Sequence, residues 1–114
     1  MDSVSPAELA RQILDGQAPL VLDVRSPAEF AAGHVPGAIN VPFWRFLVSA
    51  EPLPPSPGPI VMYCGHGPRA QIAAAALRVR GAGPIIQVDG HWAAWQRAAL
   101  PEEREAPPSG ARPL

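Results

Sequence analysis

The chemistry of this sequence centres on its single cysteine. Cys64 follows a short apolar run, 60–63, and begins the loop Cys64-Gly65-His66-Gly67-Pro68-Arg69. A segment rich in strong helix formers begins directly after the loop. A strand that delivers a cysteine into a glycine-bearing turn before a helix is typical of an anion-binding loop. Successive backbone N–H groups can turn inward there, and the helix N-terminus adds roughly half a positive charge.

The predicted anion is the thiolate of Cys64 or a group bonded to its sulfur. Loop N–H groups and the guanidinium of Arg69 favour the thiolate, which is the reactive form of a cysteine. We therefore expect Cys64 to be the catalytic nucleophile, rather than a buried structural thiol, with Arg69 as a clamp for the anionic substrate. The residues expected to bind substrate are Gly65, His66, Gly67, Pro68, Arg69 and Ala70.

A thiolate in such a loop suits two reactions. It can attack phosphorus in a phosphate ester, or it can attack a sulfane sulfur and carry that sulfur as a persulfide. Four residues separate Cys64 from Arg69, whereas cysteine phosphatases use a longer loop that encloses a tetrahedral phosphate. The shorter loop favours sulfur transfer. Arsenate reduction or phosphatase activity on the same fold stays the alternative enzymatic hypothesis.

The elements around the loop predict an α/β fold. Runs typical of buried strands occur at 20–24, 59–63 and 85–88, with a weaker one at 38–41 and a stub at 2–4. Helical or turn-rich segments separate them. This alternation favours a parallel sheet with helices between its strands.

Helix boundaries can be predicted from capping residues. The segments 5–8 and 26–29 both read Ser-Pro-Ala-Glu, a capping box with proline at the first helical position. They predict helices over 6–15 and 27–32. Two further helices are expected over 70–80, with an apolar stripe through Ile72, Ala76 and Val79, and over 91–99.

Composition bounds the remaining possibilities. With 114 residues the chain fits one domain, expected over 1–100, followed by a flexible proline-rich tail over 101–114. The proline-rich stretch 52–59 is expected to be an extended surface connection. The net charge of −1, with arginines spread along the chain, argues against a nucleic-acid partner. A lone cysteine allows no internal disulfide and no C-x-x-C metal motif, so no metal is expected.

No apolar stretch approaches the roughly 18 residues of a membrane span, and the first residues lack the basic and apolar runs of a signal peptide. We therefore expect a cytoplasmic protein without a membrane partner.

Three segments resemble the rhodanese family in order along the chain. They are the stretch 20–42, the Cys64 loop, and the stretch 88–95, which reads Val-Asp-Gly-His-Trp-Ala-Ala-Trp; together the likeness spans about residues 5–97. The resemblance implies a parallel sheet of four or five strands flanked by helices on both faces, with the cysteine loop at the carboxyl edge. It also implies a sulfurtransferase that takes sulfur from thiosulfate or a persulfide, small or protein-bound, and passes it to cyanide or a thiol. No metal or organic cofactor is implied.

Other residues near the predicted site are expected to support it rather than to react. Asp23 and Arg25 are expected to support the site, with Arg25 paired to Glu29 and Asp23 bound by loop amides. His91 stands where the family often has a second glycine, and the surface of the last helix is favoured for it over the pocket.

The remaining ring side chains have mainly structural predicted roles. His34 is expected to brace its turn by hydrogen bonds, whereas His66 is left open between donor binding and simple exposure. The aromatic residues of the segment 43–46 and of the last helix are expected mainly in the core, although those of 43–46 leave open an aromatic wall or partner patch. A non-catalytic protein-binding module is the hypothesis outside enzymology, disfavoured by the presence of Cys64.

Overall fold

The computed structural model describes residues 2–48 and 58–105. Strands and helices alternate along the chain, which confirms the α/β class. The elements are β1 (Ser3–Val4), α1 (Pro6–Leu14), β2 (Leu20–Asp23), α2 (Pro27–Ala32), β3 (Ile39–Asn40), α3 (Arg45–Val48), β4 (Ile60–Tyr63), α4 (Pro68–Val79), β5 (Ile85–Val88) and α5 (His91–Arg97). Within the described ranges, no helix has the length and apolar character needed to cross a membrane.

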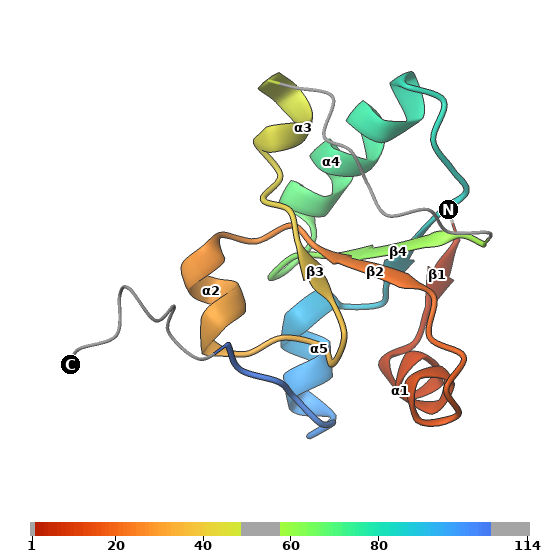
Figure 1. Cartoon of the computed structure of the whole chain (residues 1–114), viewed down its shortest axis with the longest axis vertical. Helices are drawn as coiled ribbons and strands as arrows, with labels where there is room; N and C mark the ends of the chain where they lie inside the picture. Colours follow the sequence, from red (N-terminus) through yellow and green to blue (C-terminus); the bar gives the residue numbers. More distant parts are fainter. Residues whose placement is uncertain (1, 49–57, 106–114) are drawn as a thin grey trace.

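The five strands form one parallel sheet in the order β1-β5-β4-β2-β3 (Figure 1). The central strands β2 and β4 pair along their whole lengths, so that Asp23 lies opposite Tyr63. Because parallel strands end at the same edge, the segments that follow β2, β3, β4 and β5 all emerge on one side of the sheet. This geometry brings the Cys64 loop beside segments distant from it in sequence.

Helices cover both faces of the sheet, as the family resemblance implied. In Figure 1, α3 and α4 lie on one side and α1, α2 and α5 on the other. Side chains of β4 alternate between these layers, since successive residues of a strand point to opposite faces. Met62 and Cys64 pack in the cluster that includes α4 residues, whereas Val61 and Tyr63 pack in the cluster that includes Trp92.

The two Ser-Pro-Ala-Glu segments cap helices as predicted, but only one forms the complete capping box. At α2, the Ser26 side chain accepts from the Glu29 amide while the Glu29 carboxylate accepts from the Ser26 amide. At α1, Ser5 accepts from the Glu8 amide. The Glu8 carboxylate instead accepts from Arg11, one turn further along the exposed face of the helix.

The apolar stripe predicted for α4 is wrong. Ile72 and Val79 are 43% and 88% exposed, and the buried positions are instead Ala70, Ala73, Ala74 and Leu77. Three of these are alanines, whose small side chains let the helix approach the sheet closely. Ranking positions by side-chain hydrophobicity therefore selected the wrong face.

Two further expectations need correction. Helix α3 was not predicted, because four residues after a proline carry too little periodicity to indicate a helix. The tail predicted to be flexible from 101 is attached to the domain as far as Glu105: the Trp95 indole donates to the Pro101 carbonyl, and Glu105 donates to the Ala31 carbonyl. Residues 49–57, which include most of the proline-rich connection, and 106–114 lie outside the described residues.

Gly90, the residue before α5, provides a test of the close packing at the start of this helix. Its φ is +70°, and a Cβ built there would lie 2.5 Å from the Cβ of Ala94. We expect Gly90→Ala to lower the free energy of unfolding by at least about 2 kcal/mol, from backbone strain plus overlap, measured by urea denaturation. Gly16→Ala is the matched control, because Gly16 has a φ of +73° but no atom within 4 Å. Strain alone should cost it about 1 kcal/mol; equal losses would contradict the overlap.

Candidate active site

Cys64 lies at the carboxyl edge of the central strand β4, where the sequence placed it. The residue has no exposed surface and packs in the same cluster as Ala70 and Ala73 of α4. The backbone N–H of Gly67 donates to the Cys64 sulfur at 3.0 Å. One amide of the predicted anion cradle is therefore directed at the sulfur.

The first turn of α5 anchors the start of the loop. The Trp92 amide donates to the Cys64 carbonyl at 2.9 Å, and the Ala93 amide donates to the Gly65 carbonyl at 3.2 Å. Free N–H groups at a helix start need acceptors, and the two loop carbonyls supply them. These two bonds tie the first residues of the loop to α5.

His91 lies beneath the loop and not on the surface of the last helix, which corrects the favoured expectation. Its side chain is 7% exposed in the folded domain, and its Nδ1 accepts from the Cys64 amide at 3.2 Å. An accepting Nδ1 places the proton of the neutral ring on Nε2. A Cβ built on Gly67 would lie 3.5 Å from that Nε2. The imidazole thus spans from the backbone of Cys64 to that of Gly67.

Burial lowers the pKa of His91 below its ordinary value of 6.5, and the nearby His66 lowers it further, against a smaller opposing effect of Asp89. His91 also has a φ of +55°, a conformation that a residue with a Cβ seldom adopts. The chain thus accepts local strain at a position where the family often has glycine.

Arg69 pairs with a carboxylate that the sequence did not connect to it. Its Nη1 and Nη2 donate to the two carboxylate oxygens of Glu29 at 2.6 and 3.0 Å. Hydrogen bonding to Arg69 holds the pKa of Glu29 at about 2, despite partial burial that opposes the shift. The guanidinium still lies over the loop, because a Cβ on Gly65 would be 3.1 Å from Nη2. The predicted clamp is therefore beside the loop but already holds an internal anion.

The other predicted loop residues differ in what they can offer a substrate. His66 is exposed, Gly65 and Gly67 are half-buried, and Ala70 is buried at the start of α4. Pro68 has no backbone N–H, so it can shape the loop but cannot donate.

Asp23 and Arg25 form a buried ion pair with each other, which corrects the expected pairing of Arg25 with Glu29. The distance between Arg25 Nη2 and Asp23 Oδ2 is 2.6 Å, and the Arg25 amide also donates to Asp23. The Tyr63 hydroxyl donates to the same carboxylate at 2.7 Å and accepts from the Val35 amide at 3.0 Å. Since Tyr63 directly precedes Cys64, this network supports the end of β4.

His34 and the aromatic residues have structural positions. The Nδ1–H of His34 donates to the Phe30 carbonyl at 2.8 Å, and the two rings stack at 3.6 Å between centroids. Trp92 and Trp95 are buried, as is Phe46, whereas Trp44 is 44% exposed. His34 was predicted to brace its own turn by hydrogen bonds; its ring instead binds the end of α2 through Phe30.

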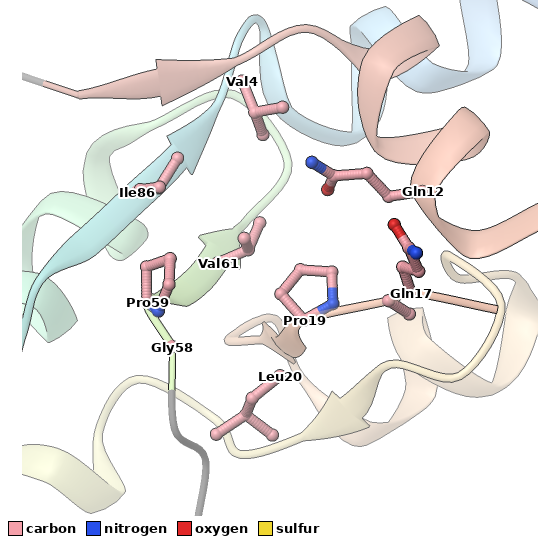
Figure 2. Close-up of a pocket in the computed structure, with 10 residues that line it drawn as sticks. Val4, Gln12, Gln17, Pro19, Leu20, Gly58, Pro59, Val61 and Ile86 are labelled. Atoms are coloured by element: carbon pink, nitrogen blue, oxygen red, sulfur yellow. The ribbon is translucent and has the colours of Figure 1, made fainter. Parts of the chain in front are cut away.

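A separate cavity of about 360 Å³ is shown in Figure 2. Gln12 and Gln17 line it together with apolar residues near the beginnings of β2 and β4, including Pro19, Leu20 and Val61. It contains no residue of the loop. In the part of the chain that the structure describes, no group of three or more His, Cys, Asp or Glu side chains is placed to hold a metal ion.

Comparison with known proteins places this geometry in a family. A model described as the rhodanese-like domain matches residues 5–98. The chain belongs to the rhodanese-like domain family. The match covers the Cys64 loop and every strand after β1, in agreement with the resemblance seen in the sequence.

Curated relatives and solved structures extend the comparison. The chain is 30% identical over 101 residues to a sulfurtransferase of Allochromatium vinosum, covering 89% of this chain and 94% of the relative. It is 35% identical over 101 residues to the thiosulfate sulfurtransferase GlpE of Pseudomonas putida, covering 86% and 87%. A rhodanese-related protein of Thermoplasma volcanium superposes with a TM-score of 0.77 at 28% identity, covering 92% of this chain and 100% of that structure.

The buried Asp23–Arg25 pair yields a stability prediction. Asp23→Ala leaves the guanidinium of Arg25 buried without its carboxylate, so we expect a loss of about 3 kcal/mol or more in the free energy of unfolding. Glu8→Ala, which breaks the exposed pair with Arg11, should hardly change the denaturation midpoint. Similar urea curves for the two variants would show that burial of the pair is unimportant.

His91 predicts a pH dependence of stability. Its folded pKa lies below its unfolded value of about 6.5, so its contribution is complete above that pH and is lost as the pH falls through the folded pKa. We expect the wild type to lose stability as the pH falls below about 6.5, and His91→Asn to lose less. Asparagine tolerates positive φ and offers an acceptor for the Cys64 amide, but it does not titrate. Parallel pH profiles in chemical denaturation would contradict this role.

Proposed function

We propose that this protein is a sulfurtransferase in which Cys64 carries the transferred sulfur as a persulfide. The observation that carries the proposal is the hydrogen bond from the Gly67 amide to the Cys64 sulfur at 3.0 Å. A buried structural thiol needs no such donor, whereas a thiolate or persulfide anion is stabilised by it. The sulfurtransferases among the relatives support the same reaction class.

The reaction consists of two displacements at sulfur. The Cys64 thiolate attacks the outer sulfur of thiosulfate or of a persulfide, a new S–S bond forms, and sulfite or a thiolate leaves with the electron pair of the old S–S bond. Cyanide or a thiolate acceptor then attacks the outer sulfur of the Cys64 persulfide and releases the Cys64 thiolate. Atoms and electrons balance across the cycle without a further oxidant or reductant.

The structure suggests how the residues divide this work. The Gly67 amide stabilises the negative sulfur, and α5 holds the loop through the Cys64 and Gly65 carbonyls. Arg69 lies at the loop, where its Nη2 would be 3.1 Å from a Cβ on Gly65. Because Cys64 has no exposed surface, a donor reaches the sulfur only when the groups that cover it are displaced. A small anionic donor with a terminal sulfur fits this requirement best, and a protein persulfide with an extended cysteine is the larger alternative. The cytoplasmic location stays a prediction.

The direct test is the mass of the intact protein. After exposure to thiosulfate or to glutathione persulfide, the wild type should gain one sulfur atom, and cyanide should remove it with release of thiocyanate. Cys64→Ser should gain none, because a serine hydroxyl is a far weaker nucleophile towards sulfur. Its far-ultraviolet circular dichroism and melting temperature should stay close to those of the wild type.

Two outcomes would contradict the proposal. Sulfur that remains bound to Cys64→Ser would place the carrier elsewhere in the chain. Failure of the wild type to gain sulfur from either donor would leave an arsenate reductase or phosphatase, or a binding module. Turnover of arsenate or of an aryl phosphate would indicate the enzyme, and no turnover would indicate the binding module.

A further inference from the structure

The ion pair between Glu29 and Arg69 joins two elements that are distant in sequence. Glu29 lies in the first turn of α2, and Arg69 lies in the first turn of α4, directly after the Cys64 loop. Both nitrogens at the end of the guanidinium contact the carboxylate, at 2.6 and 3.0 Å. The Arg69 and Glu29 side chains are 31% and 39% exposed, so both charges border on solvent.

Glu29 is held in place from its own side. Its Oε1 accepts from the amide and the hydroxyl of Ser26, each at 3.0 Å, as part of the capping box of α2. The same oxygen accepts from Arg69 Nη1. The carboxylate is therefore a fixed part of the helix cap, and moving away from Arg69 would also break the cap.

Arg69 is close enough to the loop to act on a bound anion. Its Nη2 would lie 3.1 Å from a Cβ on Gly65. The negative form of Cys64 is among the groups that raise the pKa of Arg69, after the larger effect of Glu29. A sulfur donor in the loop thus meets a cation whose charge is already balanced by a neighbouring carboxylate.

Two other basic residues near the loop do not supply a replacement. Arg25 is buried and bound to Asp23, and His91 favours its neutral form. An incoming anion therefore gains little net attraction from Arg69. The disadvantage is greater for thiosulfate, which carries two negative charges, than for a donor with one, because Coulomb energy scales with charge.

We propose that Glu29 determines the charge preference of this site, so that singly charged sulfane donors such as the persulfide of a small thiol are used in preference to dianionic thiosulfate. Glu29 acts through Arg69 and is a positioning residue. This inference rests on the proposed sulfurtransferase function and adds to it the class of donor.

Glu29→Gln tests the proposal with little change in shape. Glutamine can keep the capping contacts with Ser26 but removes the negative charge beside Arg69. The matched control is Glu8→Gln, which makes the same change at the same position of the other Ser-Pro-Ala-Glu helix start, where Glu8 pairs with the exposed Arg11.

The two donors to compare are thiosulfate and methanethiosulfonate, in which a methyl group replaces one charged oxygen. Both donate a terminal sulfur, and release of thiocyanate from cyanide measures both. We expect Glu29→Gln to raise kcat/KM for thiosulfate about fivefold and that for methanethiosulfonate about twofold. These factors correspond to the free energy that a partly exposed charge pair usually contributes. The gain in kcat/KM should come from a lower KM and should shrink at high salt. Glu8→Gln should leave kcat/KM unchanged for both donors.

A double variant checks that the effect passes through Arg69. In the protein that carries both Glu29→Gln and Arg69→Gln, the rise in kcat/KM for thiosulfate that Glu29→Gln produces alone should be absent. An equal fall in kcat/KM for both donors in Glu29→Gln would show that Glu29 only holds the loop in place. Unchanged constants would show that Arg69 does not face the donor. Either result overturns the inference while the sulfurtransferase function stands. Absence of thiocyanate from the wild type with both donors would overturn the function and the inference together.

Discussion

The site depends on the direction in which the loop after β4 presents its backbone groups. The amides of Trp92 and Ala93 bind the carbonyls of Cys64 and Gly65, and the Gly67 amide is directed at the sulfur. A peptide plane has its N–H and C=O on opposite sides, so carbonyls directed toward α5 turn the amides of Gly65 and His66 away from α5. Helix α5 therefore helps to fix the conformation of the loop around Cys64.

The rest of the fold serves to bring α5 and the loop together. Strands β4 and β5 are neighbours and parallel, so the loop after one and the helix after the other emerge at the same edge. The buried network of Asp23, Arg25 and Tyr63 then supports the last residue of β4 from β2. His91 adds an acceptor for the Cys64 amide.

Charge at the site is balanced in pairs. Arg25 lies against Asp23, and Arg69 lies against Glu29. The first pair is buried and structural, whereas the second borders on solvent beside the Cys64 loop. The charge of Arg69 is thus balanced by a carboxylate from α2. The position of the guanidinium therefore depends on α2 as well as on the loop.

Local patterns in the sequence determined the α/β class, the strands and the capped starts of α1 and α2, and they singled out Cys64, because each rests on residues within a few positions of one another. The capping serine of α2 and the Cys64 loop are examples. Tertiary structure decided what depends on contacts across the sheet. It assigned Glu29 to Arg69, 40 positions away, placed His91 beneath the loop, and attached residues 101–105 to the domain. It also chose the alanine face of α4, because close approach to the sheet favours small side chains over the most hydrophobic ones. Helical spacing alone could not reveal that choice.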